Sequence, residues 1–176
     1  MKKQICFATF VVLLIVFIGP RIFDYFFEYE ISELKSEAIS ALSEYKADID
    51  TVCFYFETYD KDDAFFVIDK KIFGLINNFM IWCNFVKEPV TDIHVLEALR
   101  RMIFGGPFSS SQLGSVSQEN NCIFFRMDDH FIADISYGIV KASSVTDIYN
   151  SQGYITHVEP LNDNGWYLYI EDYERA

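Results

Sequence analysis

The sequence predicts an α+β protein with an N-terminal transmembrane and stalk helix, then helices packed on a C-terminal antiparallel β-meander. Three observations predict this class. An apolar run opens the chain, a helical repeat of apolar residues follows it, and strand-like runs separated by turn residues close it. With 176 residues, of which 51% are hydrophobic, the chain suffices for one domain with a core.

The apolar run covers residues 4–23, which as a helix span about 30 Å, the thickness of the hydrocarbon core of a bilayer. Lys2 and Lys3 precede the run and acidic residues follow it, so the positive-inside rule places the N-terminus in the cytoplasm. The rest of the chain then lies in the periplasm or outside the cell, tethered to the cell (inner) membrane. A cleaved signal peptide and a buried core helix are alternatives, but bulky residues follow Gly19 where a signal peptidase needs small ones.

We therefore expect a membrane anchor over residues 1–23, a stalk helix over 24–48 and a single extracytoplasmic α+β domain over 49–176. Apolar residues of the stalk recur at steps of three and four, with glutamates between them. This stripe predicts a helix that packs one face on the domain. A coiled-coil dimer seam is the alternative, although the stripe covers only about three heptads.

The first half of the domain contains three apolar segments. Residues 51–58 are rich in β-branched and aromatic side chains, which favours a strand. Residues 64–68 suit either a strand or the start of a helix. Residues 72–86 predict a strongly buried helix, with a second transmembrane span as the alternative.

Residues 91–104 show the clearest pattern of a soluble helix, because apolar side chains fall on one face and Gly105, Gly106 and Pro107 follow. Residues 108–121 are small, polar and without periodicity, so a mobile surface loop is expected there. No internal repeat or linker divides the domain.

Four strand-like runs make up the predicted meander. Residues 128–130 would form the first turn, and Asn164-Gly165 indicates a hairpin between the last two strands because both residues tolerate positive φ. The runs cover residues 122–127, 131–142, 154–158 and 166–171.

The last strand predicts a surface for a partner. Trp166, Leu168 and Ile170 would face the core, whereas the alternate tyrosines would lie on an exposed face among carboxylates. Tyrosines among acidic groups suit a cationic protein partner, although tyrosine is also an ordinary strand residue. The predicted partner-binding residues are Tyr154, Tyr167, Tyr169, Tyr173, Glu171 and Asp172.

Charge narrows the classes of partner. The chain carries −12, and residues 1–27 hold Lys2, Lys3 and Arg21 against Asp24, a net +2, so residues 28–176 carry −14. A domain this acidic repels nucleic-acid phosphates and anionic lipid surfaces, whereas a basic protein is favoured. Solubility alone is the simpler explanation of the charge.

Few residues suggest a catalytic, cofactor-binding or metal-binding role. Cys6 lies in the anchor, and Cys53, Cys83 and Cys122 each lie in an apolar run, as buried thiols do, although two of them could pair outside the cytoplasm. No cofactor motif and no phosphate-binding glycine loop are present. One dense group of hard ligands could hold a cation or simply form a polar hairpin tip: Asp128, Asp129, His130 and Asp134.

The sequence therefore predicts a membrane-anchored interaction protein, and no set of catalytic residues stands out. Such a protein would act as an immunity or inhibitor protein against a basic toxin or hydrolase, or as an accessory subunit of an envelope complex. The alternative is an envelope hydrolase whose active site is dispersed along the chain.

Overall fold

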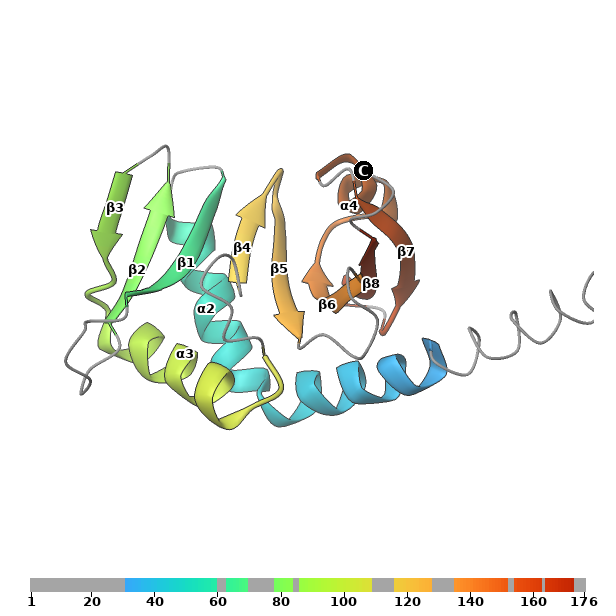
Figure 1. Ribbon diagram of the computed structural model, residues 1–176, viewed down its shortest axis with the longest axis horizontal. Coiled ribbons are helices and arrows are strands. Elements are labelled where there is room, and N and C mark those ends of the chain that lie inside the picture. Colours follow the sequence, from blue (N-terminus) through green and yellow to red (C-terminus); the bar gives the residue numbers. More distant parts are fainter. Residues whose placement is uncertain are drawn as a thin grey trace, which may run out of the picture. The chain divides into compact units, whose positions relative to one another are not determined.

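The computed structural model describes residues 31–59, 63–69, 78–83, 86–108, 116–127, 135–151, 154–162 and 164–172. The chain divides into two compact units, Met1–Glu37 and Ala38–Ala176. Residues 31–37 of the first unit are helical, as are residues 38–44 of the second, so a helix is confirmed over this part of the segment predicted as a stalk. The second unit is α+β, with helices packed on an antiparallel sheet of eight strands among the described residues (Figure 1).

Helix α2 (Lys46–Thr58) corrects the prediction of a strand over residues 51–58. Its buried residues recur every three or four positions, and only a helix places such residues on one face: Ile49, Val52, Cys53 and Phe56. Local composition favoured a strand, but the burial of this face against the rest of the domain decided for a helix. Asp48 on α2 accepts from Arg101 of the third helix at 2.6 Å, which ties the two helices together.

The next segment forms strands, so the prediction of a buried helix over residues 72–86 is wrong where the structure describes it. Phe79, Ile81 and Cys83 are buried while Met80 and Trp82 are half-buried, and this alternation is typical of a strand. The register on both sides is antiparallel. The strands are β1 (Ala64–Asp69), β2 (Asn78–Cys83) and β3 (Val86–Pro89).

Helix α3 (Ile93–Gly105) confirms the helix predicted over residues 91–104. Asp92 caps it, because its carboxylate accepts from the N–H groups of His94 at 2.8 Å and Val95 at 3.3 Å.

Part of the segment 108–121, predicted as a surface loop, forms regular structure instead. Phe108 is buried and bridges to Met127, and a hairpin follows whose strands are β4 (Val116–Glu119) and β5 (Cys122–Met127). Asn120 and Asn121 form its two-residue turn with φ of 47° and 63°. Asparagine tolerates this left-handed conformation, which suits the twist of a tight hairpin.

The C-terminal strands are confirmed, but their order is not that of a meander. β8 lies between β6 and β7, and an additional helix, α4, connects β6 to β7. The predicted hairpin between the last two strands is present, with Gly165 at φ 77°. The bounds are β6 (Ile135–Lys141), α4 (Val145–Ser151), β7 (Ile155–Pro160) and β8 (Trp166–Asp172).

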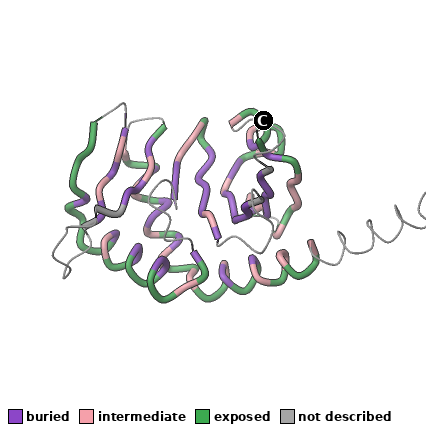
Figure 2. The backbone as a smooth tube through the Cα atoms, viewed as in Figure 1, coloured by how far each residue is buried: buried purple, intermediate pink, exposed green. Residues whose placement is uncertain are grey.

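Helices cover the two faces of this sheet separately. Phe56 of α2 packs on Phe66 with ring centroids 5.0 Å apart. Ile148 of α4 packs with Phe124 and Tyr169, whose strand register places them on the opposite face from Phe66. Figure 2 shows that β5 is buried along most of its length, whereas the edge strand β3 is exposed.

Gly138 on β6 leaves room for an aromatic ring. A Cβ atom at this position would collide with the carbonyl oxygen of Phe125 and would lie 2.8 Å from Cε1 of Tyr169. The Tyr169 ring, only 1% exposed, therefore lies directly over the glycine and packs edge-on against Phe124 at 5.2 Å.

We predict that Gly138→Ala lowers the free energy of unfolding by about 2 kcal/mol, because the backbone of β5 and the Tyr169 ring must both shift. Urea denaturation followed by tryptophan fluorescence measures this loss. Gly105→Ala is the matched control, since nothing lies within 4 Å of its added methyl group. Equal stability of the two variants would contradict the close packing at Gly138.

Candidate binding pocket

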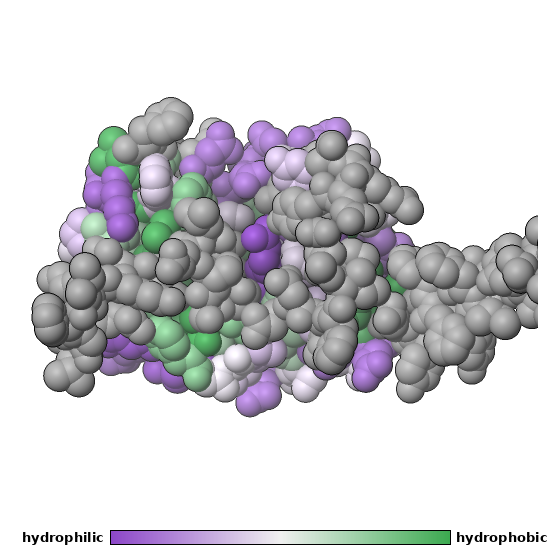
Figure 3. All heavy atoms as spheres, viewed as in Figure 1, coloured by the Kyte–Doolittle hydropathy of each residue, from purple (hydrophilic) through white to green (hydrophobic). Residues whose placement is uncertain are grey.

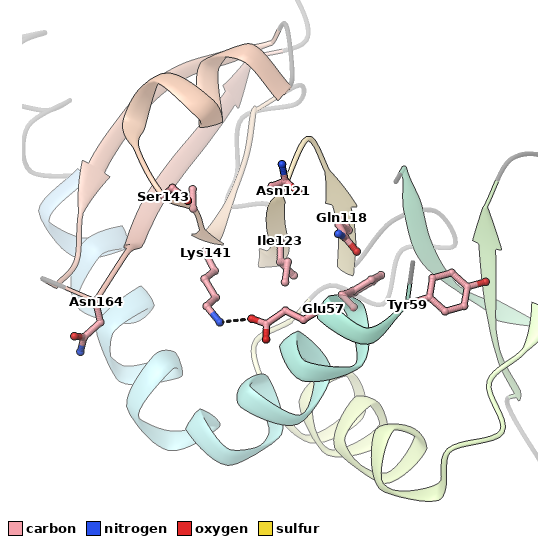
Figure 4. Close-up of a pocket in the computed structure, with 10 residues that line it drawn as sticks. Glu57, Tyr59, Gln118, Asn121, Ile123, Lys141, Ser143 and Asn164 are labelled. Carbon is pink, nitrogen blue, oxygen red and sulfur yellow. Dashed lines mark hydrogen bonds and ion pairs between the residues drawn. The ribbon is translucent and has the colours of Figure 1, made fainter. Parts of the chain in front are cut away.

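A pocket of about 450 Å³ opens where the C-terminal end of α2 meets the ends of several strands. Its walls come from the β4–β5 turn, the end of β6 and the turn before β8 (Figure 4). This volume lies in the range of small-molecule sites. The polar residues that line it are Glu57, Gln118, Asn121, Lys141, Ser143 and Asn164.

Local sequence explains why polar groups gather there. Helix α2 ends at Thr58, and two tight turns bring Asn121 and Asn164 to the same end of the sheet. Gln118 and Ile123 are register partners on β4 and β5, so their side chains share the sheet face that α2 covers. The buried ring of Phe56 contributes apolar lining.

An ion pair crosses one side of the pocket, where Lys141 Nζ donates to Glu57 Oε1 at 2.8 Å (Figure 4). This hydrogen bond raises the pKa of Lys141, so the ammonium form persists to higher pH than usual. The pair connects β6 to α2 and has no net charge.

Gln118 has an unsatisfied group in the pocket. Its Oε1 atom is buried and accepts no hydrogen bond from the residues that the structure describes. A buried acceptor without a donor is costly, so a donor from solvent or from a ligand would stabilise it.

No cysteine among the described residues lines the pocket. Burial raises the pKa of Cys53 to about 12, so its thiol stays protonated at neutral pH. Burial also raises the pKa of Cys122. Within the described part of the chain Cys53, Cys83 and Cys122 are buried thiols and form no disulfide, as expected for apolar runs. Cys6 lies outside the described residues.

A second polar cluster is buried on the opposite face of the sheet. Glu171 is fully buried, and one of its carboxylate oxygens accepts from Arg126 Nη2 at 2.8 Å and from Ser136 Oγ at 2.7 Å. Arg126 is 24% exposed along its side chain. The guanidinium and the hydroxyl together offset the cost of burying this carboxylate.

The partner surface predicted from the C-terminal strand does not form as expected. Tyr169 and Glu171 are both buried. Tyr169 packs in one cluster with Ile148 of α4, a helix that the sequence did not predict, and Glu171 lies against Arg126 and Ser136. Tyr154 is 43% exposed and Tyr167 is half-buried, so a role for these two in binding stays a prediction. Tyr173 and the side chain of Asp172 lie outside the described residues.

The predicted metal ligands Asp128, Asp129, His130 and Asp134 also lie outside the described residues. Across the positions that are described, no group of three or more potential ligands could hold a metal ion.

Exposed apolar residues are scattered over the surface. On the face drawn in Figure 3, the hydrophobic residues in view lie mainly over the part formed by β1–β3 and α3, interspersed with hydrophilic residues. Val86, Ile93 and Phe104 are each about half exposed. Phe54 on α2 is the most exposed large hydrophobic residue among those described, at 67%.

We predict that Arg126→Met lowers the free energy of unfolding by about 3 kcal/mol, because it leaves the Glu171 carboxylate buried without its cation. The double variant Arg126→Met/Glu171→Leu should recover most of this loss, since no charge then remains in the interior. Urea denaturation measures both. Arg100→Met, at an exposed position on α3, is the control and should change stability by less than about 0.5 kcal/mol.

The anchor predicted over residues 4–23 lies outside the described residues, and no helix within the described ranges has the length and apolar character to cross a membrane. The chain matches no protein-family model, no curated protein and no solved structure.

Proposed function

We propose that this chain is a membrane-anchored interaction protein without catalytic activity, whose acidic domain binds a basic protein partner outside the cytoplasm. The apolar character and length of residues 4–23 support the anchor, and Lys2 and Lys3 before it support the orientation. The stalk, residues 24–48, then leads to the binding domain, residues 49–176.

The charge of the domain supports a basic partner. Three of its cations, Arg101, Arg126 and Lys141, each pair with a carboxylate of the same chain, and Lys46 of the stalk does so with Asp50. The remaining surplus of carboxylates produces a negative field that steers a cationic protein toward the domain and raises its rate of association.

One surface of α2 carries this proposal. Asp50, Phe54 and Glu57 follow each other at steps of four and three residues, so they form one stripe on the exposed side of the helix. The 67% exposed ring of Phe54 lies between the two carboxylates on this stripe, which we call the α2 stripe. An aromatic anchor beside acidic groups suits a cationic protein interface.

The carboxylates of the α2 stripe are available to a partner. Asp50 pairs with Lys46 at 2.7 Å and Glu57 pairs with Lys141 at 2.8 Å, and both pairs are substantially exposed to solvent. Exposed ion pairs contribute only about 0–1 kcal/mol each, so a lysine or arginine of the partner can replace the internal cation at little cost.

Two concrete forms fit this proposal. An immunity or inhibitor protein would use the domain to neutralise a basic toxin or hydrolase at the envelope. An accessory subunit of an envelope complex would make its principal contacts through the anchor and the stalk.

We predict that the tagged full-length chain, solubilised in detergent, captures one basic protein in stoichiometric amount at low salt and loses it at high salt. Phe54→Ala should weaken the capture by about tenfold or more, because it removes the aromatic anchor of the α2 stripe. Ile93→Ala is the matched control, since Ile93 is similarly exposed but lies on α3. The captured protein is identified and quantified by mass spectrometry.

Other outcomes of this capture contradict parts of the proposal. A partner that is retained at high salt and lost when residues 4–23 are replaced would indicate contacts through the membrane segment. Capture of no protein by the unaltered chain would contradict the interaction function and favour the envelope hydrolase.

We predict that alkaline phosphatase fused after Ala176 is active in a bacterial host, because this enzyme matures only after export from the cytoplasm. Exchange of Lys2 and Lys3 for glutamate should reduce this activity by weakening the orientation signal. An inactive fusion of the unaltered chain would contradict the outward placement of the domain.

A further inference from the structure

We infer that the pocket at the C-terminal end of α2 binds a neutral ligand rich in hydroxyl groups, of the kind presented by a sugar residue. The inference concerns a different feature from the α2 stripe and does not rest on the proposed protein partner. Glu57 is shared by both, but the other polar groups of the pocket come from the strands and turns.

The charges of the pocket favour a neutral ligand. The domain is strongly acidic, yet the pocket holds one carboxylate and one ammonium group, already paired at 2.8 Å. Both charges in the pocket are already paired, so an ionic ligand meets no unpaired opposite charge among the lining residues, and an anion is also repelled by the acidic domain. A neutral ligand keeps the pair and can still accept from Lys141 and donate to Glu57.

The polar groups that line the pocket favour a ligand with several hydroxyl groups. Gln118, Asn121 and Asn164 each carry an amide that both donates and accepts, and the Ser143 hydroxyl does the same. Hydroxyl groups of a ligand also do both, so several of them can satisfy such a lining in many relative orientations. A ligand with only donors or only acceptors would leave part of the lining unpaired.

The pocket lining also contains an unsatisfied hydrogen-bond acceptor. Gln118 Oε1 is buried and, within the described part of the chain, accepts no hydrogen bond. This oxygen has almost no surface accessible to solvent, so the Gln118 side chain must rotate into the pocket before a ligand hydroxyl can donate to it, and that hydrogen bond would then offset the cost of the buried acceptor. A ligand gains most binding energy where it completes the hydrogen bond of a buried polar group that lacks one.

The arrangement of polar and apolar surfaces in the pocket suits a sugar ring. The pocket combines its polar rim with the apolar surfaces of Phe56 and Ile123, and Tyr59 lies at its edge (Figure 4). A sugar ring has hydroxyl groups around its rim and C–H groups on its faces, so it can present both kinds of surface. At about 450 Å³ the pocket is large enough for a ligand of small-molecule size.

The test uses glucose and three related probes with the full chain in nanodiscs of phosphatidylcholine, because detergents with sugar headgroups would compete. Ligand-observed NMR titrations compare glucose with glucuronate, which adds a carboxylate, with glucosamine at slightly acidic pH, which adds an ammonium group, and with acetamide. We expect glucose to bind more tightly than each of the other three by about tenfold or more. Equal or tighter binding of a charged sugar or of acetamide, or no binding of glucose, would overturn the inference.

Variants locate the binding in this pocket. Gln118→Leu removes the unsatisfied acceptor together with its amide, and Ser143→Ala removes one hydroxyl from the rim; each should weaken glucose binding by about threefold to tenfold. Asn150→Ala, at an exposed position on α4 outside the pocket, is the matched control. The urea midpoint of each variant shows that it is folded. Unchanged glucose affinity in both folded pocket variants would overturn the assignment to this site.

Discussion

Burial of both faces at the centre of the sheet determines where the helices can lie. Strand β5 alternates between two apolar faces, with Phe125 on one and Phe124 on the other, and both rings are buried. Helices must therefore pack on each face, and α2 and α4 do so from opposite sides. This packing also requires a glycine at position 138, because a side chain there would displace Tyr169 from under α4.

Helix α2 is the element on which both proposed binding regions depend. One face of it is buried in the domain, Asp48 ties it to α3, and Glu57 ties it to the end of β6. These contacts turn the opposite side, with Phe54, toward solvent and place the end of the helix at the pocket. The charges of α2 thus have a structural role within the domain, because Asp48 and Glu57 pair with cations of other elements.

The acidic residues of this protein serve different physical purposes according to their burial. Glu171 is fully enclosed and depends on Arg126 and Ser136, so its contribution is to the integrity of the domain. Asp50 and Glu57 are at the surface, where their charge acts over distance and is screened by salt. Net charge alone does not separate these two groups of carboxylates, because it takes no account of burial.

The sequence by itself determined the elements whose signals are local. The amphipathic stripe of α3, the hairpin at Gly165 and the apolar C-terminal strands were all predicted, because capping, turn conformation and periodicity act within a few residues. Only the tertiary structure decided that residues 51–58 are helical and that β8 lies between β6 and β7. The pocket was also beyond prediction, since Lys141 and Glu57 are 84 residues apart. These features depend on which surfaces bury one another, and that choice is made by long-range packing that overrides local preference.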